Sequence, residues 1–304
     1  MNKLRKIIIG LSVFLLLVFF ALFQIFTQTR YLSKEEVGKI YQEIDKAKSL
    51  QDLERKYYFS IADILEKYNS SVLISGPLPL GTYVLPSELI VQEIESAVVK
   101  TDEGETDFLK DLDLTFLNED ELELGKSYFK LFVQEYTKYP LEWMAYSAPP
   151  WIVLAKEVKS HEKAVGGLLN GIVVYDVSSA SNDPEYTRKL IHHELMHWIE
   201  HYTQTAEDPD WPEKENEYLY TYDLSTEEYP RYGFVTDYAQ VNAHEDKAET
   251  YAYLMTADGN RKLNERVKTD KILEGKVNYL KGLISSHVLG INDSYYNNRI
   301  LNSK

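Results

Sequence analysis

The chain has 304 residues, 44% of them hydrophobic, which is enough to bury the core of one large domain or of two of ordinary size. Its formal net charge of −15 excludes a nucleic-acid partner, because phosphate binding needs clustered lysine and arginine. The chain has no cysteine, which excludes disulfides, thiolate metal ligands and a cysteine nucleophile.

A long apolar run opens the chain. Residues 7–26 contain no charged side chain, and as a helix they would span about 30 Å, the thickness of the bilayer hydrocarbon. Lys3, Arg5 and Lys6 precede the run, which favours a cytoplasmic N-terminus. We therefore expect residues 1–30 to be a basic N-terminus and an uncleaved transmembrane signal anchor, with the rest of the chain outside the cytoplasm. Secretion after signal cleavage is the alternative.

The next region, residues 31–140, has a mainly helical pattern. Hydrophobic side chains recur at intervals of three and four between residues 33 and 68, which predicts one or two amphipathic helices. We expect a glycine- and proline-rich loop at residues 70–87. Two helices should follow, at 87–100 and 118–139. The last of these helices begins at Asn118.

The pattern changes in residues 141–304. Two β-branched segments predict strands at 151–158 and 171–177. Asp183 followed by Pro184 predicts the start of a helix that runs to about Tyr202. Two more helices are expected at 241–257 and 260–287, so this region is α+β.

The first of these helices contains His193-Glu194-Leu195-Met196-His197, which matches the pattern His-Glu-x-x-His. Residues four apart lie on one face of a helix, so both imidazoles can bind one Zn²⁺ ion. Glu194 lies beside the first histidine and can take a proton from an attacking water. The motif therefore predicts one catalytic zinc ion, with Glu194 as the general base.

A catalytic zinc needs a third protein ligand. His201 continues the spacing, but three ligands four apart rise about 12 Å along a straight helix, too far for one tetrahedral ion. His192 points to another face, so both are expected to be bystanders or groups that contact the ligands from outside. Glu245 and Glu249 share a face of the second helix. One of the two can bind zinc, and the other can accept the N–H of a zinc-bound histidine.

A family resemblance separates these two roles. The pattern Tyr-x(6)-Glu-Asp-x-Ala-Glu, downstream of His-Glu-x-x-His, resembles the gluzincin metallopeptidases related to anthrax lethal factor and the Pro-Pro endopeptidases, and a group of exported bacterial zinc metallopeptidases. It covers roughly residues 145–260. The resemblance implies the zinc ligands His193, His197 and Glu245, the general base Glu194, the supporting Glu249 and the oxyanion-stabilising Tyr238. His244 is the alternative third ligand.

The resemblance also implies a fold and an activity. The fold is a zincin-like catalytic domain at 141–304, with a small mixed sheet, an active-site helix and a second metal-ligand helix. The helical region and the transmembrane helix precede it. The activity is hydrolysis of peptide bonds, with an extended peptide adding as a strand to a sheet edge, for which we expect the strand at 171–177. A hydrolase of a cell-wall amide and a non-catalytic module stabilised by zinc are the alternatives.

Overall fold

The computed structural model describes residues 29–72, 81–83, 113–149, 151–160, 163–164, 167–169, 172–177, 183–205, 210–212, 218–221, 227–288 and 290–301. The expected membrane anchor at 7–26 and the helix expected at 87–100 lie outside these residues. Within the described ranges, no helix combines the length and the apolar character needed to cross a bilayer.

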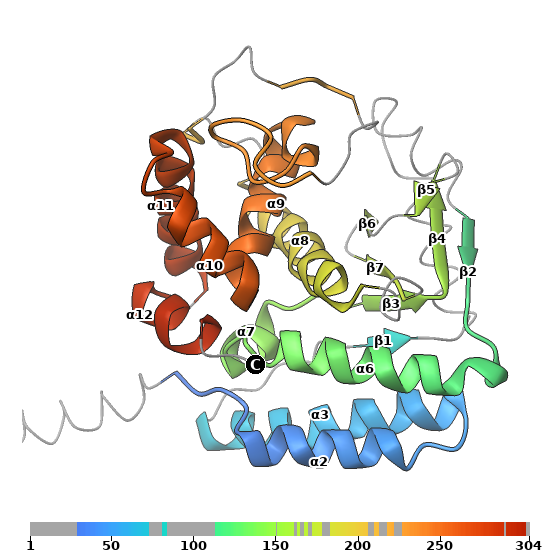
Figure 1. Ribbon diagram of the computed structural model, residues 1–304. Coiled ribbons are helices and arrows are strands. Elements are labelled where there is room, and N and C mark those ends of the chain that lie inside the picture. Colours follow the sequence, from blue (N-terminus) through green and yellow to red (C-terminus); the bar gives the residue numbers. More distant parts are fainter. Residues whose placement is uncertain are drawn as a thin grey trace, which may run out of the picture.

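Three long helices form one side of the molecule, namely α2 (Lys34–Asp45), α3 (Leu50–Val72) and α6 (Leu122–Tyr136) (Figure 1). The first two confirm the amphipathic pattern of residues 33–68. α2 begins with a capping box, in which the Ser33 side chain accepts from the Glu36 amide at 3.2 Å and Glu36 accepts from the Ser33 amide at 2.8 Å. The 3-10 turn η1 (Glu119–Glu121) precedes α6 and begins after Asn118, as expected.

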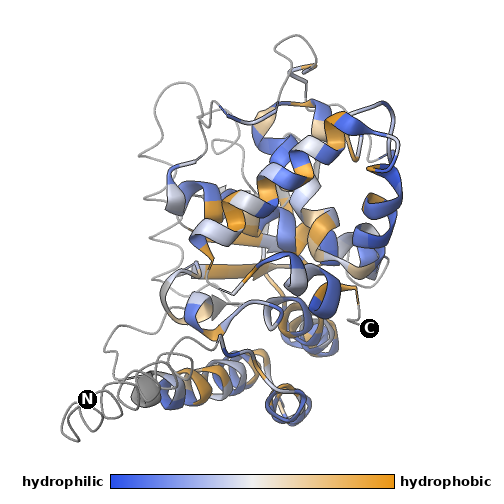
Figure 2. Cartoon of the chain, turned by 90° about the vertical axis from the view of Figure 1, so that its left-hand side faces the viewer, coloured by the Kyte–Doolittle hydropathy of each residue, from blue (hydrophilic) through white to orange (hydrophobic). Residues whose placement is uncertain are grey.

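A four-stranded mixed sheet lies above α6 in the view of Figure 1. Its order is β1-β3-β7-β6, formed by β1 (Gly81–Tyr83), β3 (Trp151–Ala155), β7 (Ile172–Asp176) and β6 (Gly167–Leu169). The first three strands are parallel and β6 is antiparallel to β7. β3 and β7 are almost entirely buried, which explains their continuous hydrophobic sequences (Figure 2).

Three expectations about strands were wrong. The segment 151–158 is not one strand, because the chain bends at Lys156, which pairs with Glu121. The second half becomes β4 (Glu157–Ser160) in a separate antiparallel sheet with β2 (Asp113–Thr115) and β5 (Lys163–Ala164). The expected loop at 70–87 contains β1. The segment 171–177 is not a sheet edge, because β7 pairs with β3 on one side and β6 on the other.

The remaining helices cover the sheet and extend away from it. They are α7 (Leu141–Tyr146), α8 (Pro184–Thr203), α9 (Ala243–Met255), α10 (Ala257–Arg266), α11 (Lys271–His287), the short α12 (Asp293–Tyr295) and the π-turn η4 (Tyr296–Ile300). The helix expected at 260–287 is in fact two helices. The chain turns after Arg266, and the Asp270 side chain accepts from the Leu273 amide at 3.0 Å to start α11.

One hydrophobic cluster runs through the described residues, from Leu32 to Ile300. Phe132 of α6 contacts the ring of Tyr175 in β7, with centroids 5.8 Å apart. The Tyr175 hydroxyl donates to the Ile191 carbonyl of α8 at 3.1 Å. The sheet, α6 and α8 therefore meet at the buried ring of Tyr175. The face of α8 that is turned away from this ring packs on α9.

Candidate metal centre

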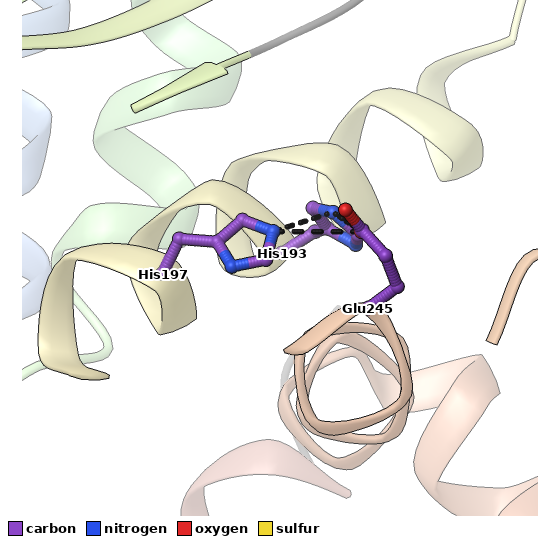
Figure 3. Close-up of side chains that lie close together, drawn as sticks. All are labelled: His193, His197 and Glu245. Atoms are coloured by element: carbon purple, nitrogen blue, oxygen red, sulfur yellow. Dashed lines mark hydrogen bonds and ion pairs between the residues drawn. The ribbon is translucent and has the colours of Figure 1, made fainter. Parts of the chain in front are cut away.

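The candidate site lies where α8 packs against α9. Asp183 begins α8 as expected, since its side chain accepts from the amides of Glu185 and Tyr186 at 3.1 and 3.0 Å. Asn242 begins α9 by accepting from the Glu245 amide at 3.0 Å, which places Glu245 in the first turn. Figure 3 shows His193 and His197 projecting from α8 toward Glu245 of α9.

Three side-chain atoms converge at this point. The Nε2 atoms of His193 and His197 are 3.2 Å apart, and the Oε2 atom of Glu245 lies 3.1 Å from the first and 3.5 Å from the second. Ligands bonded to a tetrahedral zinc at about 2.0–2.1 Å are roughly 3.3 Å from one another. The His-His-Glu set, with two imidazoles and one carboxylate, could therefore hold a metal ion.

The charges around this triangle favour a cation. Burial alone would lower the pKa of His193, but hydrogen bonds to Glu245 and Glu249 raise that pKa well above its usual value. Burial also opposes charge on His197, yet Glu245 and Glu200 raise its pKa to about 9. Burial would raise the pKa of Glu245, but the two histidines hold it well below its usual range. The residues thus suit a divalent metal in charge as well as in spacing.

Each histidine is supported by a second carboxylate. The Nδ1 atom of His193 lies 2.8 Å from Oε1 of Glu249. The Nδ1 atom of His197 lies 3.5 Å from Oε2 of Glu200. A carboxylate at Nδ1 keeps the proton there and leaves Nε2 as the atom that can bind a metal. Glu200 was missed from the sequence, although its position three residues after His197 was a usable signal.

Glu194 is buried beside the triangle, with 4% of its surface exposed. Its Oε2 atom has no hydrogen-bond partner among the residues that the structure describes. Burial raises the pKa of Glu194, although the two histidines oppose this effect. A carboxylate with an unused oxygen and an increased affinity for protons is suited to accept a proton from a reactant.

Tyr238 lies in the 3-10 turn η3 (Tyr238–Gln240), which directly precedes α9. Its ring is 6.1 Å from the His193 ring between centroids. The structure therefore places Tyr238 next to the first of the two histidines, although η3 is separated from α8 by more than thirty residues of sequence.

The remaining histidines near the site face elsewhere. His192 is buried on the opposite side of α8, with its Nδ1 atom 3.0 Å from the Tyr139 hydroxyl and its Nε2 atom 2.9 Å from Glu135. His201 is exposed and packs against Trp198, with ring centroids 5.7 Å apart. The Nδ1 atom of His244 is 3.6 Å from Glu200, outside the triangle. Glu245, not His244, is the α9 residue that joins the two histidines.

A protein-family match also points to zinc binding by this part of the chain. Residues 144–284 match the model of the family described as "Putative zinc-binding metallo-peptidase". The matched region runs from α7 to α11 and contains all six predicted site residues. The narrower resemblance to gluzincins stays a prediction, because the description of this family does not name that group.

One solved structure that resembles this chain is described as a putative zinc-binding metallo-peptidase from Bacteroides caccae. The identity is 19%, the alignment covers 70% of this chain and 92% of that chain, and the TM-score is 0.41. The search of curated proteins found no match.

Proposed function

We propose that this chain is a zinc-dependent metallopeptidase, anchored in a membrane with its catalytic region outside the cytoplasm. The observation that carries the proposal is the triangle of His193, His197 and Glu245 with the buried Glu194 beside it. A site that only stabilised the fold would have no use for an adjacent carboxylate with an oxygen that none of the described residues bonds. The match of residues 144–284 to a zinc-binding metallopeptidase family supports the same activity.

His193, His197 and Glu245 would hold the metal. Zinc in such a site supplies Lewis-acid polarisation of the substrate carbonyl and makes water easier to deprotonate. Oε2 of Glu194 takes the proton of the attacking water and passes it to the nitrogen of the leaving amine. The hydroxyl of Tyr238 donates to the oxygen on which negative charge develops. Glu249 and Glu200 keep the two imidazoles oriented.

The substrate would bind as an added strand. Because β7 is paired on both sides, this role moves to β6, which is the last strand of the order β1-β3-β7-β6. β6 also contacts α8, the helix that carries the two histidines. An extended peptide that pairs with the side of β6 away from β7, which no described strand occupies, would present its backbone carbonyl groups along the site.

Peptide cleavage and zinc content test this function together. Wild-type protein should cut members of a peptide library, and Glu194→Gln should retain zinc but lose turnover, because the amide cannot accept the proton. Glu245→Ala should lose zinc, because only two ligands remain. Zinc retained at full stoichiometry by Glu245→Ala would refute the third ligand. Zinc bound without any peptide cleavage would instead favour another amide substrate or a non-catalytic module.

The membrane anchor is tested separately. Full-length protein should sediment with membranes and resist extraction by high salt, because the uncharged run at 7–26 is long enough to span the bilayer. Residues 29–304 expressed alone should remain in the supernatant. An external protease should reach the catalytic region in intact cells if that region lies outside the cytoplasm. A full-length protein found entirely in the supernatant would refute the anchor.

A further inference from the structure

One hydroxyl group connects two parts of the candidate site. Thr236 is 2% exposed, and its Oγ1 atom donates to Oε2 of Glu249 at 2.7 Å. The same oxygen accepts the backbone N–H of Ala239 at 3.1 Å. The hydroxyl thus acts as donor toward α9 and as acceptor toward the turn η3.

The backbone of Thr236 is held in a way that aims this hydroxyl. Thr236 forms an antiparallel bridge with Glu228. Hydrogen bonds on either side of the bridge join the Tyr229 amide to the Val235 carbonyl at 2.8 Å and the Asp237 amide to the Glu227 carbonyl at 2.9 Å. The position of the hydroxyl is therefore set by the segment 227–237, which we call the bridge segment.

The bridge segment is in turn tied to the helices of the site. The Glu228 carboxylate contacts Lys189 of α8 at 3.0 Å and accepts from the Tyr253 hydroxyl of α9 at 2.8 Å. Lys262 of α10 reaches the same carboxylate at 2.9 Å. Because contacts to three helices hold the bridge segment in place, the Thr236 hydroxyl has a fixed position relative to the Glu249 carboxylate.

Toward α9, the hydroxyl determines how Glu249 is oriented. Oε1 of Glu249 faces Nδ1 of His193 at 2.8 Å, and Thr236 occupies Oε2. With both oxygens bonded, rotation of the carboxylate would break two partly buried hydrogen bonds. The carboxylate therefore keeps the His193 proton on Nδ1 and directs Nε2 toward Glu245 and His197.

Toward η3, the hydroxyl begins the turn that carries Tyr238. The N–H of Ala239 is one of the donors at the start of this turn that the turn itself leaves unbonded. The Tyr238 ring lies 6.1 Å from the His193 ring. Loss of the Thr236 hydroxyl would thus shift Tyr238, because the backbone of its turn loses a hydrogen bond. The same loss would free the Glu249 carboxylate to rotate and so change the orientation of His193.

We propose that Thr236 is a positioning residue that sets the orientation of His193 and the place of Tyr238 at the same time. The part that concerns Tyr238 rests on the proposed peptidase activity. The part that concerns His193 rests only on metal binding, so the two parts can fail separately.

Zinc affinity, measured by competition with a chelator, tests the first part. Thr236→Val keeps the shape but removes the hydroxyl, and it should weaken zinc binding by about 10- to 100-fold, the effect typical of lost outer-shell partners. Thr236→Ser keeps the hydroxyl and should bind zinc close to the wild-type level. Thr236→Val with wild-type zinc affinity would overturn the proposal.

Thr250→Val is the matched control. Thr250 follows Glu249 on α9 and is fully buried, and its Oγ1 atom has no hydrogen-bond partner in the described part of the chain. Its removal should leave zinc affinity unchanged. Circular dichroism and urea unfolding of the zinc-free proteins establish that each variant is folded. An equal loss of zinc affinity in Thr250→Val would show a general packing effect and overturn the proposal.

Peptide cleavage by Thr236→Val, Tyr238→Phe and the double variant tests the second part. Each assay is run at saturating zinc, and the fold-decrease in kcat/KM is measured for each variant. If Thr236 acts on Tyr238, the fold-decrease in the double variant should be smaller than the product of the two single fold-decreases. A loss equal to that product would refute the link to Tyr238. If wild-type protein cuts no peptide, the peptidase function fails, and the zinc affinities alone decide the role of Thr236.

Discussion

His193 and His197 are the same residue type on one face of α8, and the second nitrogen of each faces a different carboxylate. Glu249 of α9 supports the first ring, and Glu200 of α8 itself supports the second. Glu200 lies three residues after His197, so helix spacing alone brings it to that ring. Glu249 reaches His193 only because α9 packs against α8. Each carboxylate also makes its imidazole a stronger metal ligand.

His192 has a different electrostatic role from its neighbour in the sequence. It is fully buried, and its Nδ1 atom accepts from the Tyr139 hydroxyl, which in turn accepts from Tyr251 at 3.2 Å. Its Nε2–H donates to Glu135, which Lys138 and Arg188 also contact. Burial lowers the pKa of His192 to about 4, so the ring is neutral at pH 7.

This lowered pKa predicts a pH dependence of stability. The stabilising contribution of neutral His192 is complete above its ordinary pKa of 6.5 and is lost as the pH falls toward 4. Between about pH 7.5 and about pH 5, wild-type protein should lose on the order of 2 kcal/mol more unfolding free energy than His192→Gln. Urea unfolding of both proteins in zinc-free buffer measures the difference. Identical pH dependence in the two proteins would show that His192 does not titrate this way.

At the scale of elements, a buried ion pair joins the two helices of the site. Lys247 of α9 is fully buried, contacts Oε1 of Glu200 on α8, and donates to the Thr205 carbonyl at 3.2 Å. Burial would raise the pKa of Glu200, but hydrogen bonds with His197 and His244, together with the positive charge of Lys247, lower it to about 2. The pair holds Glu200 ionised next to His197 and connects the end of α8 with α9.

Removing Lys247 alone should lower the free energy of unfolding more than removing the charges of both Lys247 and Glu200. Lys247→Met leaves Glu200 charged and buried without the ammonium group that contacts its Oε1 atom, which should destabilise the fold by about 3 to 5 kcal/mol. The double variant Glu200→Gln/Lys247→Met should recover much of this loss, because no buried charge is left alone. Urea unfolding of the single and double variants measures both effects.

The control for this experiment is an exposed pair. Lys39 lies 2.7 Å from Glu35 on α2, and both side chains are exposed. Lys39→Met should leave the unfolding midpoint unchanged within error, because exposed ion pairs contribute little. A double variant at Glu200 and Lys247 that is as unstable as Lys247→Met would contradict the view that the isolated charge causes the loss.

At the scale of the whole molecule, the hydrophobic cluster is continuous across the division predicted at residue 140. It includes Leu53 of α3, Phe132 of α6 and Leu195 of α8. α6 packs against both α2 and α8. The division into regions 31–140 and 141–304 stays a prediction, and the continuous packing predicts that the helices of both regions unfold together.

A substitution far from the site tests this coupling. Leu53→Ala removes a fully buried side chain and should lower the unfolding free energy by about 2 to 5 kcal/mol. Zinc release and loss of helix signal should shift together to lower urea concentration. Phe59→Ala, on the same helix but 61% exposed, should change the free energy by less than about 0.5 kcal/mol. Zinc release at an unchanged midpoint in Leu53→Ala would mean that α3 unfolds independently of the site.

The sequence alone was sufficient for features that depend on local spacing. The capped starts of the helices at Asn118 and Asp183 follow from cap residues. The shared face of His193 and His197 and the existence of the buried strands β3 and β7, but not the end of β3, follow from helix and strand periods. The choice of Glu245 and Glu249 needed a family resemblance in addition, because a pair of glutamates four apart is common on solvated helices.

Only the tertiary structure decided which segments meet. Periodicity shows which face of a helix is apolar but not which residue of another element lies opposite, so Lys247 beside Glu200 and Thr236 beside Glu249 had no signal in the sequence. The edge of the sheet was misplaced for the same reason, since the hydrophobic pattern of β7 does not reveal that β6 pairs with it. Spacing along one helix brought the two histidines together, whereas the packing of α9 and the bridge segment against α8 completed the site.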